Sequence, residues 1–140
     1  MAITSAICNS FKQEILEAEH DFTASSGNTF NLALYDSSAS LGASTTAYTS
    51  SEEITNTSGS AYSAKGQALT SVTPTLDSST AVCDFSDISW TTASFTARGC
   101  MIFNDSHSSD ASVCCIDFGG DKTATSGTFT IQFPAAAAST

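Results

Sequence analysis

The segment from Thr80 to Asp105, TAVCDFSDISWTTASFTARGCMIFND, constrains the fold more than any other part of the sequence. It contains the only tryptophan, Trp90, and three of the nine phenylalanines, set among β-branched and small residues without a proline. This density of aromatic and β-branched residues is typical of strands. The segment therefore predicts strands that cover a hydrophobic core.

Alternation along this segment predicts which side chains share a face. In residues 95–104 the apolar face carries Phe95, Ala97, Gly99, Met101 and Phe103. Residues 91–94 are polar and lie between two apolar runs, so they predict the turn of a hairpin.

Upstream of that turn the alternation changes phase. Cys83 and Phe85 share one parity, whereas Ile88 and Trp90 share the other. A bulge or bend at residues 86–87 would keep all four side chains inward.

Further strands are expected wherever alternating or apolar runs stand between turn residues. These runs are residues 30–35, 47–54, 61–65, 67–73, 113–118 and 128–133. Pro74 is expected to end one of these strands. Residues 119–122 and 126–127 are expected to form turns, and residues 36–46 are expected to form a polar loop. Glu52 and Glu53 are expected to lie on an exposed strand edge, where their charges discourage unwanted pairing. The pattern predicts a mainly β fold, an antiparallel β-sandwich or jelly-roll-like domain with one N-terminal amphipathic helix.

The helix is predicted from apolar residues at helical spacing after a capping box of Ser10 and Gln13. His20 is expected to bond the last helical carbonyls. The chain is therefore expected to form a single domain, with an arm (1–9), a helix (10–22), a β-sandwich (29–134) and a tail (135–140).

Composition limits the partners of this chain. Its 140 residues include 25 Ser and 20 Thr, and the formal net charge is −10. Phosphate backbones and anionic membranes attract Lys and Arg clusters, so neither nucleic acid nor a membrane is an expected partner. The first residues lack the pattern of a secretory signal, and no apolar run is long enough to span a membrane.

Five cysteines occur without a CxxC pair, and the adjacent Cys114 and Cys115 must face opposite sides of a strand. We expect all five to be reduced packing residues. A zinc site of Cys100, His107 and Cys114 is the alternative, although that spacing fits no compact ligand pattern.

No arrangement of residues in the sequence is typical of a catalytic site, and no cofactor is expected. The polar segment 104–112 holds Asp105, His107 and Asp110, which could form a metal or acid-base cluster but also suit a solvated loop. Asp84, Asp87 and Asp117 could bind calcium or sugar. Arg98, the only arginine, is expected to pair with a carboxylate in a structural salt bridge, with ligand recognition as the alternative.

Several longer phrases also resemble a known family. NSFKQEIL, TFNLALYDSSASLGASTTAYT, FTARGCMIFN and IDFGGDKTATSGTFTIQFP are similar to a group of small virion proteins of tailed bacteriophages. The resemblance covers roughly residues 9–134 and contains no catalytic motif. It implies a β-sandwich made in the host cytoplasm that decorates the outer capsid surface, bound to the major capsid protein as a homo-oligomer, with a trimer expected.

The residues expected at the partner interface are Ile3, Ile7 and Phe11, because this short apolar segment lacks a core of its own. Deletion of residues 1–8 is accordingly expected to leave a folded protein that no longer binds particles. The alternative function is another head or tail component, or a module that binds host glycans. Tyr35, Tyr48 and Tyr62 are the aromatic residues available for that role.

Overall fold

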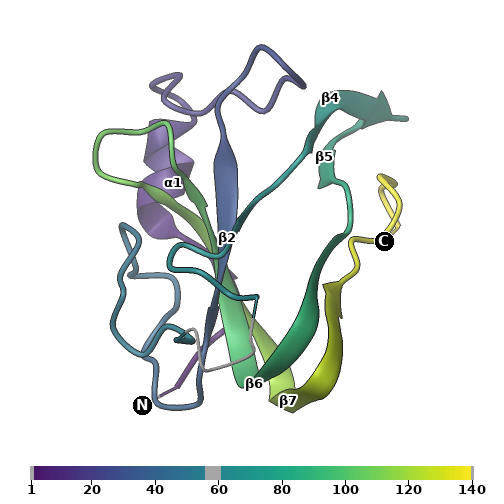
Figure 1. Cartoon of the computed structure of the whole chain (residues 1–140). Coiled ribbons are helices and arrows are strands. Elements are labelled where there is room, and N and C mark those ends of the chain that lie inside the picture. The colour runs from purple at the N-terminus through teal and green to yellow at the C-terminus, as the bar shows by residue number, and fades with distance from the viewer. Residues whose placement is uncertain (1, 56–60, 140) are drawn as a thin grey trace.

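The computed structural model describes residues 2–55 and 61–139 and shows a mainly β, antiparallel fold. The helix is α1 (Asn9–Glu14), and the strands are β1 (Ala6–Ile7), β2 (Phe30–Tyr35), β3 (Gln67–Ala68), β4 (Ser71–Asp77), β5 (Thr80–Phe85), β6 (Ile88–Asn104) and β7 (Ser112–Ile131). Five strands form one sheet in the order β1-β7-β6-β2-β3, and β4 pairs with β5 separately (Figure 1).

The long hairpin of β6 and β7 bends back on itself. Figure 1 shows both strands curving at the bottom of the molecule, so that their two halves face each other. The register between the strands shifts three times near the bend, at Trp90/Ala93, Ala93/Phe95 and Ala97/Gly99. Because each bulge adds a residue that the partner strand does not match, it sharpens twist and bending. One hairpin therefore supplies strands to two facing layers. The first layer is the half that pairs with β1 and β2, and the second layer is the half formed by the start of β6 and the end of β7, next to β4 and β5.

Several expected turns lie inside these strands. β6 runs through residues 91–94, and β7 runs through residues 119–122 and 126–127, so the turn predictions there are wrong. The turn-like residues instead give positive φ angles within the bent strands: 55° at Thr92, 74° at Gly119 and 46° at Ser126.

The other strand predictions have mixed outcomes. Residues 30–35 form β2 as predicted, but β4 continues through Pro74, where the register with β5 shifts. Within the described residues of 47–54 and 61–65 there is no regular strand, only isolated bridges such as Tyr35 to Glu53.

The larger core lies between the two halves of the bent hairpin. Trp90, Phe95 and Ile102 all belong to it, although strict alternation would place Phe95 on the opposite face. The bulges near Thr92 and Arg98 each reverse the phase, so that all three side chains point the same way. Met101 therefore lies on the opposite face from Phe95, and the predicted common face is wrong beyond Ala97.

The chain changes phase at residues 86–87 as predicted, because β5 ends at Phe85 and β6 begins at Ile88. Phe85, Ile88 and Trp90 are buried. Cys83 is exposed, so its predicted inward orientation is wrong.

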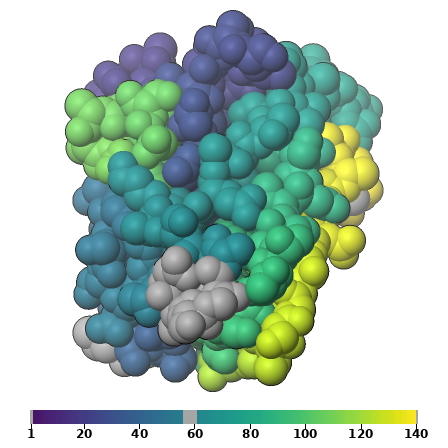
Figure 2. All heavy atoms as spheres, in the orientation of Figure 1, coloured from purple at the N-terminus to yellow at the C-terminus, as the bar shows by residue number. Residues whose placement is uncertain are grey.

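A second, smaller core covers the other face of the sheet. Met101, Phe103 and Cys115 pack there against Ile3 and the loop residues Ala39 and Leu41. Gly99 makes this approach possible, since a Cβ at this position would lie 2.8 Å from Cδ1 of Ile3. The loop over residues 36–46 thus covers this face of the sheet as well as connecting its strands. In Figure 2 the blue and teal part of the chain that includes this loop occupies the lower left of the view.

The helix is shorter than expected. It spans six residues, its N-cap is Cys8, and no side chain caps it. The predicted capping box and the predicted extent of the helix, residues 10–22, are therefore wrong. The chain turns at residues 15–18, where Ala18 has a φ of 61° and Leu16 is 87% exposed. Phe22 lies beyond the helix and stacks on Phe30 with ring centroids 4.2 Å apart.

The segment after β7 lies along β4 and β5. The backbone N–H of Phe133 donates to Asp87 Oδ1 and that of Ala138 donates to Asp77 Oδ2, both at 2.8 Å. Within the described part of the expected tail, Ala138 is therefore bonded to the end of β4.

Replacement of Trp90 by alanine is expected to lower the free energy of unfolding by about 3 to 5 kcal/mol, the usual cost of deleting a large buried aromatic ring. Trp90 is 1% exposed and packs near Tyr62, Phe95 and Phe129. Urea denaturation measures the change. The matched variant Trp90→Phe should cost less, because the indole N–H has no hydrogen-bond partner among the described residues. Equal costs for the two variants would contradict this packing.

Candidate functional site

An apolar groove lies beside β7, where the two halves of the strand face each other. It has a volume of about 580 Å³, a size typical of binding pockets. Its apolar lining includes Leu32, Cys100, Ile116, Phe118, Phe129 and Phe133. We call this feature the β7 groove.

An exposed apolar strip borders the β7 groove. Ile7 of β1 pairs with Cys114, which places it on the same face of the sheet as Ile116. Ile7 is 49% exposed and Ile116 is 37% exposed. These two side chains, which we call the edge strip, extend the apolar surface of the groove to the edge of the sheet.

The three residues expected at a partner interface have different environments. Ile3 is 6% exposed and packs in the smaller core, so its own chain already covers it. Phe11 is partly buried between the two cores and contacts His20 and Phe22. Only Ile7 remains substantially exposed. The segment before α1 is therefore part of the fold, and the premise that it lacks a core of its own is wrong.

Charged groups near the groove are few. Arg98 lies at the bend and donates from Nε to Asp117 Oδ1 at 2.9 Å, with Asp121 further away at 3.8 Å, which confirms the predicted salt bridge. The hydrogen bond from Arg98 holds the pKa of Asp117 below its usual value. Lys122 also lines the groove, and no carboxylate lies within ion-pair distance of it in the described structure.

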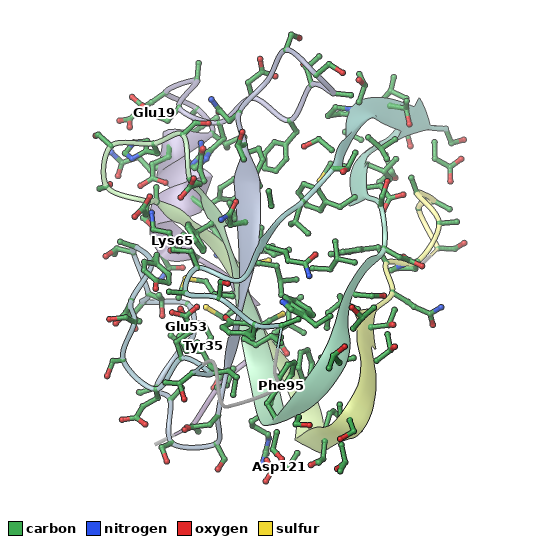
Figure 3. All side chains as sticks on the ribbon, viewed as in Figure 1. Glu19, Tyr35, Glu53, Lys65, Phe95 and Asp121 are labelled. Atoms are coloured by element: carbon green, nitrogen blue, oxygen red, sulfur yellow. The ribbon has the colours of Figure 1, made fainter. Side chains whose placement is uncertain are left out.

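A buried carboxylate ties residues 48–55 and 61–65 to the sheet. Glu53 is 8% exposed, and its Oε1 accepts hydrogen bonds from Tyr62 Oη at 2.7 Å and from the backbone N–H of Lys65 at 2.8 Å. Its Oε2 accepts from Tyr48 Oη at 2.5 Å. Figure 3 shows Glu53, Tyr35 and Lys65 close together on one side of the sheet. Glu53 is thus an internal acceptor, and the prediction of an exposed acidic edge is wrong for it.

The three tyrosines considered for glycan binding belong to this network. Tyr35 and Tyr62 are fully buried, and Tyr35 donates to the carbonyl of Thr49 at 2.7 Å. Tyr62 Oη also accepts the N–H of Leu34. Their rings pack inside the protein, so these residues do not form an aromatic platform on the surface.

Lys65 closes the same network at the surface. Its Nζ lies 2.9 Å from both Asp105 Oδ1 and Asp110 Oδ2, and 5.6 Å from the ring centroid of Tyr48. The hydrogen bonds to Asp110 and then Asp105 raise the pKa of Lys65. The carboxylates of segment 104–112 thus neutralise a lysine, and the described residues contain no cluster of His, Cys, Asp and Glu suited to a metal ion.

His20 links α1 to β6 through side-chain hydrogen bonds. Its Nε2 lies 2.9 Å from Glu14 Oε2, and its Nδ1 lies 3.1 Å from Nδ2 of the buried Asn104. Because Asn104 Oδ1 accepts the N–H of Ser106, its Nδ2 is the donor and His20 Nδ1 the acceptor. His20 therefore bonds two side chains, and the prediction that it bonds the last helical carbonyls is wrong.

The five cysteines are all free thiols. Cys114 packs against the larger core and Cys115 lies in the smaller one, so these neighbours face opposite sides as expected.

Comparison with known proteins gives no relative: no protein family matches the chain, and neither does any curated protein or solved structure. Within the described ranges, no helix has the length and apolar character needed to cross a bilayer.

Glu53→Gln is expected to lower the free energy of unfolding by about 1 to 3 kcal/mol, because an amide nitrogen cannot accept the hydrogen bond that Oε2 now accepts from Tyr48. Chemical denaturation measures the change. Glu52→Gln is the matched control, since Glu52 is exposed and should change stability by no more than about 0.5 kcal/mol. An equal loss of stability in both variants would contradict the role of Glu53 as an internal hydrogen-bond acceptor.

The tyrosines should resist ionisation in the folded protein. Burial raises the pKa of Tyr48 to about 12, and burial together with Glu53 raises the pKa of Tyr35 and Tyr62. Since an unfolded tyrosine ionises near pH 10, this contribution to stability is complete below about pH 10 and is lost as the pH rises through the folded-state values. A spectrophotometric titration should show little phenolate in the folded protein at pH 10, and phenolate should appear when the protein unfolds. Half-ionisation of the three tyrosines near pH 10 in folded protein would contradict the network.

Proposed function

We propose that this protein is a structural component of a virus particle, a capsid decoration or cement protein that binds the major capsid protein on the outer surface. The observation that carries the proposal is the β7 groove with its edge strip, Ile7 and Ile116. Half-exposed aliphatic side chains beside an apolar groove are typical of surfaces that a protein partner covers. The resemblance of the sequence to small phage virion proteins supplies the kind of partner.

The remaining surface suits an outward position on a capsid. Its polar character comes from hydroxyls, and its formal net charge of −10 would repel packaged nucleic acid on the inner side. The proposal includes self-association as a homo-oligomer, with a trimer expected from the analogy with decoration proteins at local threefold positions.

A host-glycan-binding module is the second candidate, and the geometry favours it less. Sugar sites commonly use exposed aromatic rings, whereas Tyr35 and Tyr62 are buried and Tyr48 bonds Glu53. The ion pairs of Lys65 with Asp105 and Asp110 also occupy carboxylates that a polar ligand would need.

The proposal predicts that Ile7→Thr and Ile116→Thr each reduce binding to stripped particles by about tenfold or more, because each removes a central apolar contact. Threonine keeps the β-branched shape of isoleucine, so the strands should persist. Binding is measured by co-sedimentation of purified protein with virions from which it has been removed.

The control for this experiment is Leu76→Thr, since Leu76 is 73% exposed on β4, in the second layer, and is not part of the groove. Wild-type binding by the two edge-strip variants would exclude this surface. Binding of the wild-type protein to host cells and not to particles would instead favour the glycan module. Deletion of residues 1–8 is a poor test, because it also removes β1 and the buried side chain of Ile3.

A further inference from the structure

Two buried thiols lie together where the N-terminal segment meets β7. Cys8 is 0% exposed and Cys115 is 1% exposed, and both belong to the smaller core. Each Sγ lies 3.9 Å from the same acceptor, the carbonyl oxygen of Gly42.

The strand register brings the two cysteines to the same face. Ala6 pairs with Cys115 and Ile7 pairs with Cys114, and the N–H of Cys8 donates to the carbonyl of Val113 at 3.0 Å. Cys8 and Cys115 are thus diagonal neighbours across β1 and β7. The two thiols also share a hydrogen bond with each other, so their sulfur atoms are close as well as on one face.

The chemistry of the pair is unequal. A hydrogen bond from Cys115 lowers the pKa of the Cys8 thiol to about 7, whereas the hydrogen bond with Cys8, together with burial, raises the pKa of Cys115. Cys8 is therefore the thiol of the pair that loses its proton more readily, and the thiolate is the nucleophilic form.

We propose that Cys8 and Cys115 form a disulfide bond when the protein passes from a reducing to an oxidising environment, which locks the N-terminal segment to β7. The oxidant is a small-molecule disulfide. The Cys8 thiolate attacks one of its sulfurs and expels one thiolate, and Cys115, losing its proton to solvent, then displaces the second from the mixed disulfide. Two protein thiols and one small disulfide become one protein disulfide and two small thiols.

The oxidant reaches Cys8 when the segment before α1 opens locally. A few backbone hydrogen bonds hold this segment outside β1, including Thr4 N–H to Leu41, Leu41 N–H to Ala2 and Asn9 N–H to Ala43. A segment attached by so few bonds opens at a lower free energy than the whole domain.

The other three cysteines lack this arrangement. Cys100 is buried in the larger core, and burial raises its pKa. Cys114 faces the larger core, and burial raises its pKa to about 12. Cys83 is exposed on β5, where it could link two molecules, so the experiment uses a Cys83→Ser background.

The test is incubation of folded full-length Cys83→Ser protein with oxidised glutathione, followed by alkylation in denaturant and mass spectrometry. Oxidation should remove two of the four thiols that can be alkylated. Before alkylation, the mass of the protein should fall by that of two hydrogen atoms. Trypsin cleaves after Lys12 and Arg98 and after Lys122, so the disulfide should join peptide 1–12 to peptide 99–122 without reductant. The additional changes Cys114→Ser and Cys100→Ser should preserve the link, whereas Cys115→Ser should abolish it.

The oxidised protein should also melt about 5 to 10 °C higher than the reduced protein, because the link closes a long loop of the unfolded chain. Retention of all four thiols by folded protein would overturn the proposal. So would a link to Cys114 or Cys100, or a link that forms only after denaturation. The main measurement is the loss of thiols in protein that keeps both Cys8 and Cys115. The test therefore still holds if a Cys115→Ser variant fails to fold.

Discussion

The bend in the β6–β7 hairpin is the constraint on which the rest of the structure depends. Both layers of the fold contain parts of the same two strands, so the larger core exists only if both strands turn at the same level. The bulges at the bend reverse the phase of β6 twice and keep Trp90, Phe95 and Ile102 inward. An unbulged hairpin would point Phe95 away from Trp90 and leave the aromatic cluster without a common interior.

The other face of the five-stranded sheet is covered by a different kind of contact. Strand β2, which pairs with β6, has buried side chains on both faces, so something other than the hairpin must cover the outer one. The segment before α1 and the loops from residue 36 onward do so, held by the Glu53 carboxylate and the ion pairs of Lys65. Once both faces are covered, an apolar surface remains at the β7 edge, where the short β1 pairs with β7 at only two residues. The proposed docking surface is therefore the part of the sheet that the chain itself leaves incomplete.

The sequence was sufficient for the mainly β class, for β2, for the burial of Trp90 and for the salt bridge of Arg98. Each of these rests on local alternation or on the cost of leaving a lone charge without a partner. The bend could not be predicted, because residues 91–94 and 119–122 have the composition of turns, and a bulge uses the same residues as a turn. The structural role of Glu53 was also missed, since its partners Tyr48, Tyr62 and Lys65 give no periodic signal. The β7 groove combines residues from β2, β6 and both halves of β7, which only the folded chain brings together.

The most direct test of the functional account is hydrogen exchange of the protein free in solution and bound to particles. The account predicts that binding slows exchange at residues 5–7 and 114–118, which form the β1–β7 edge, and leaves residues 36–46 and 105–111 unchanged. Slower exchange confined to those two loops, with no change at the β1–β7 edge, would contradict the assignment of this edge as the surface that binds the capsid.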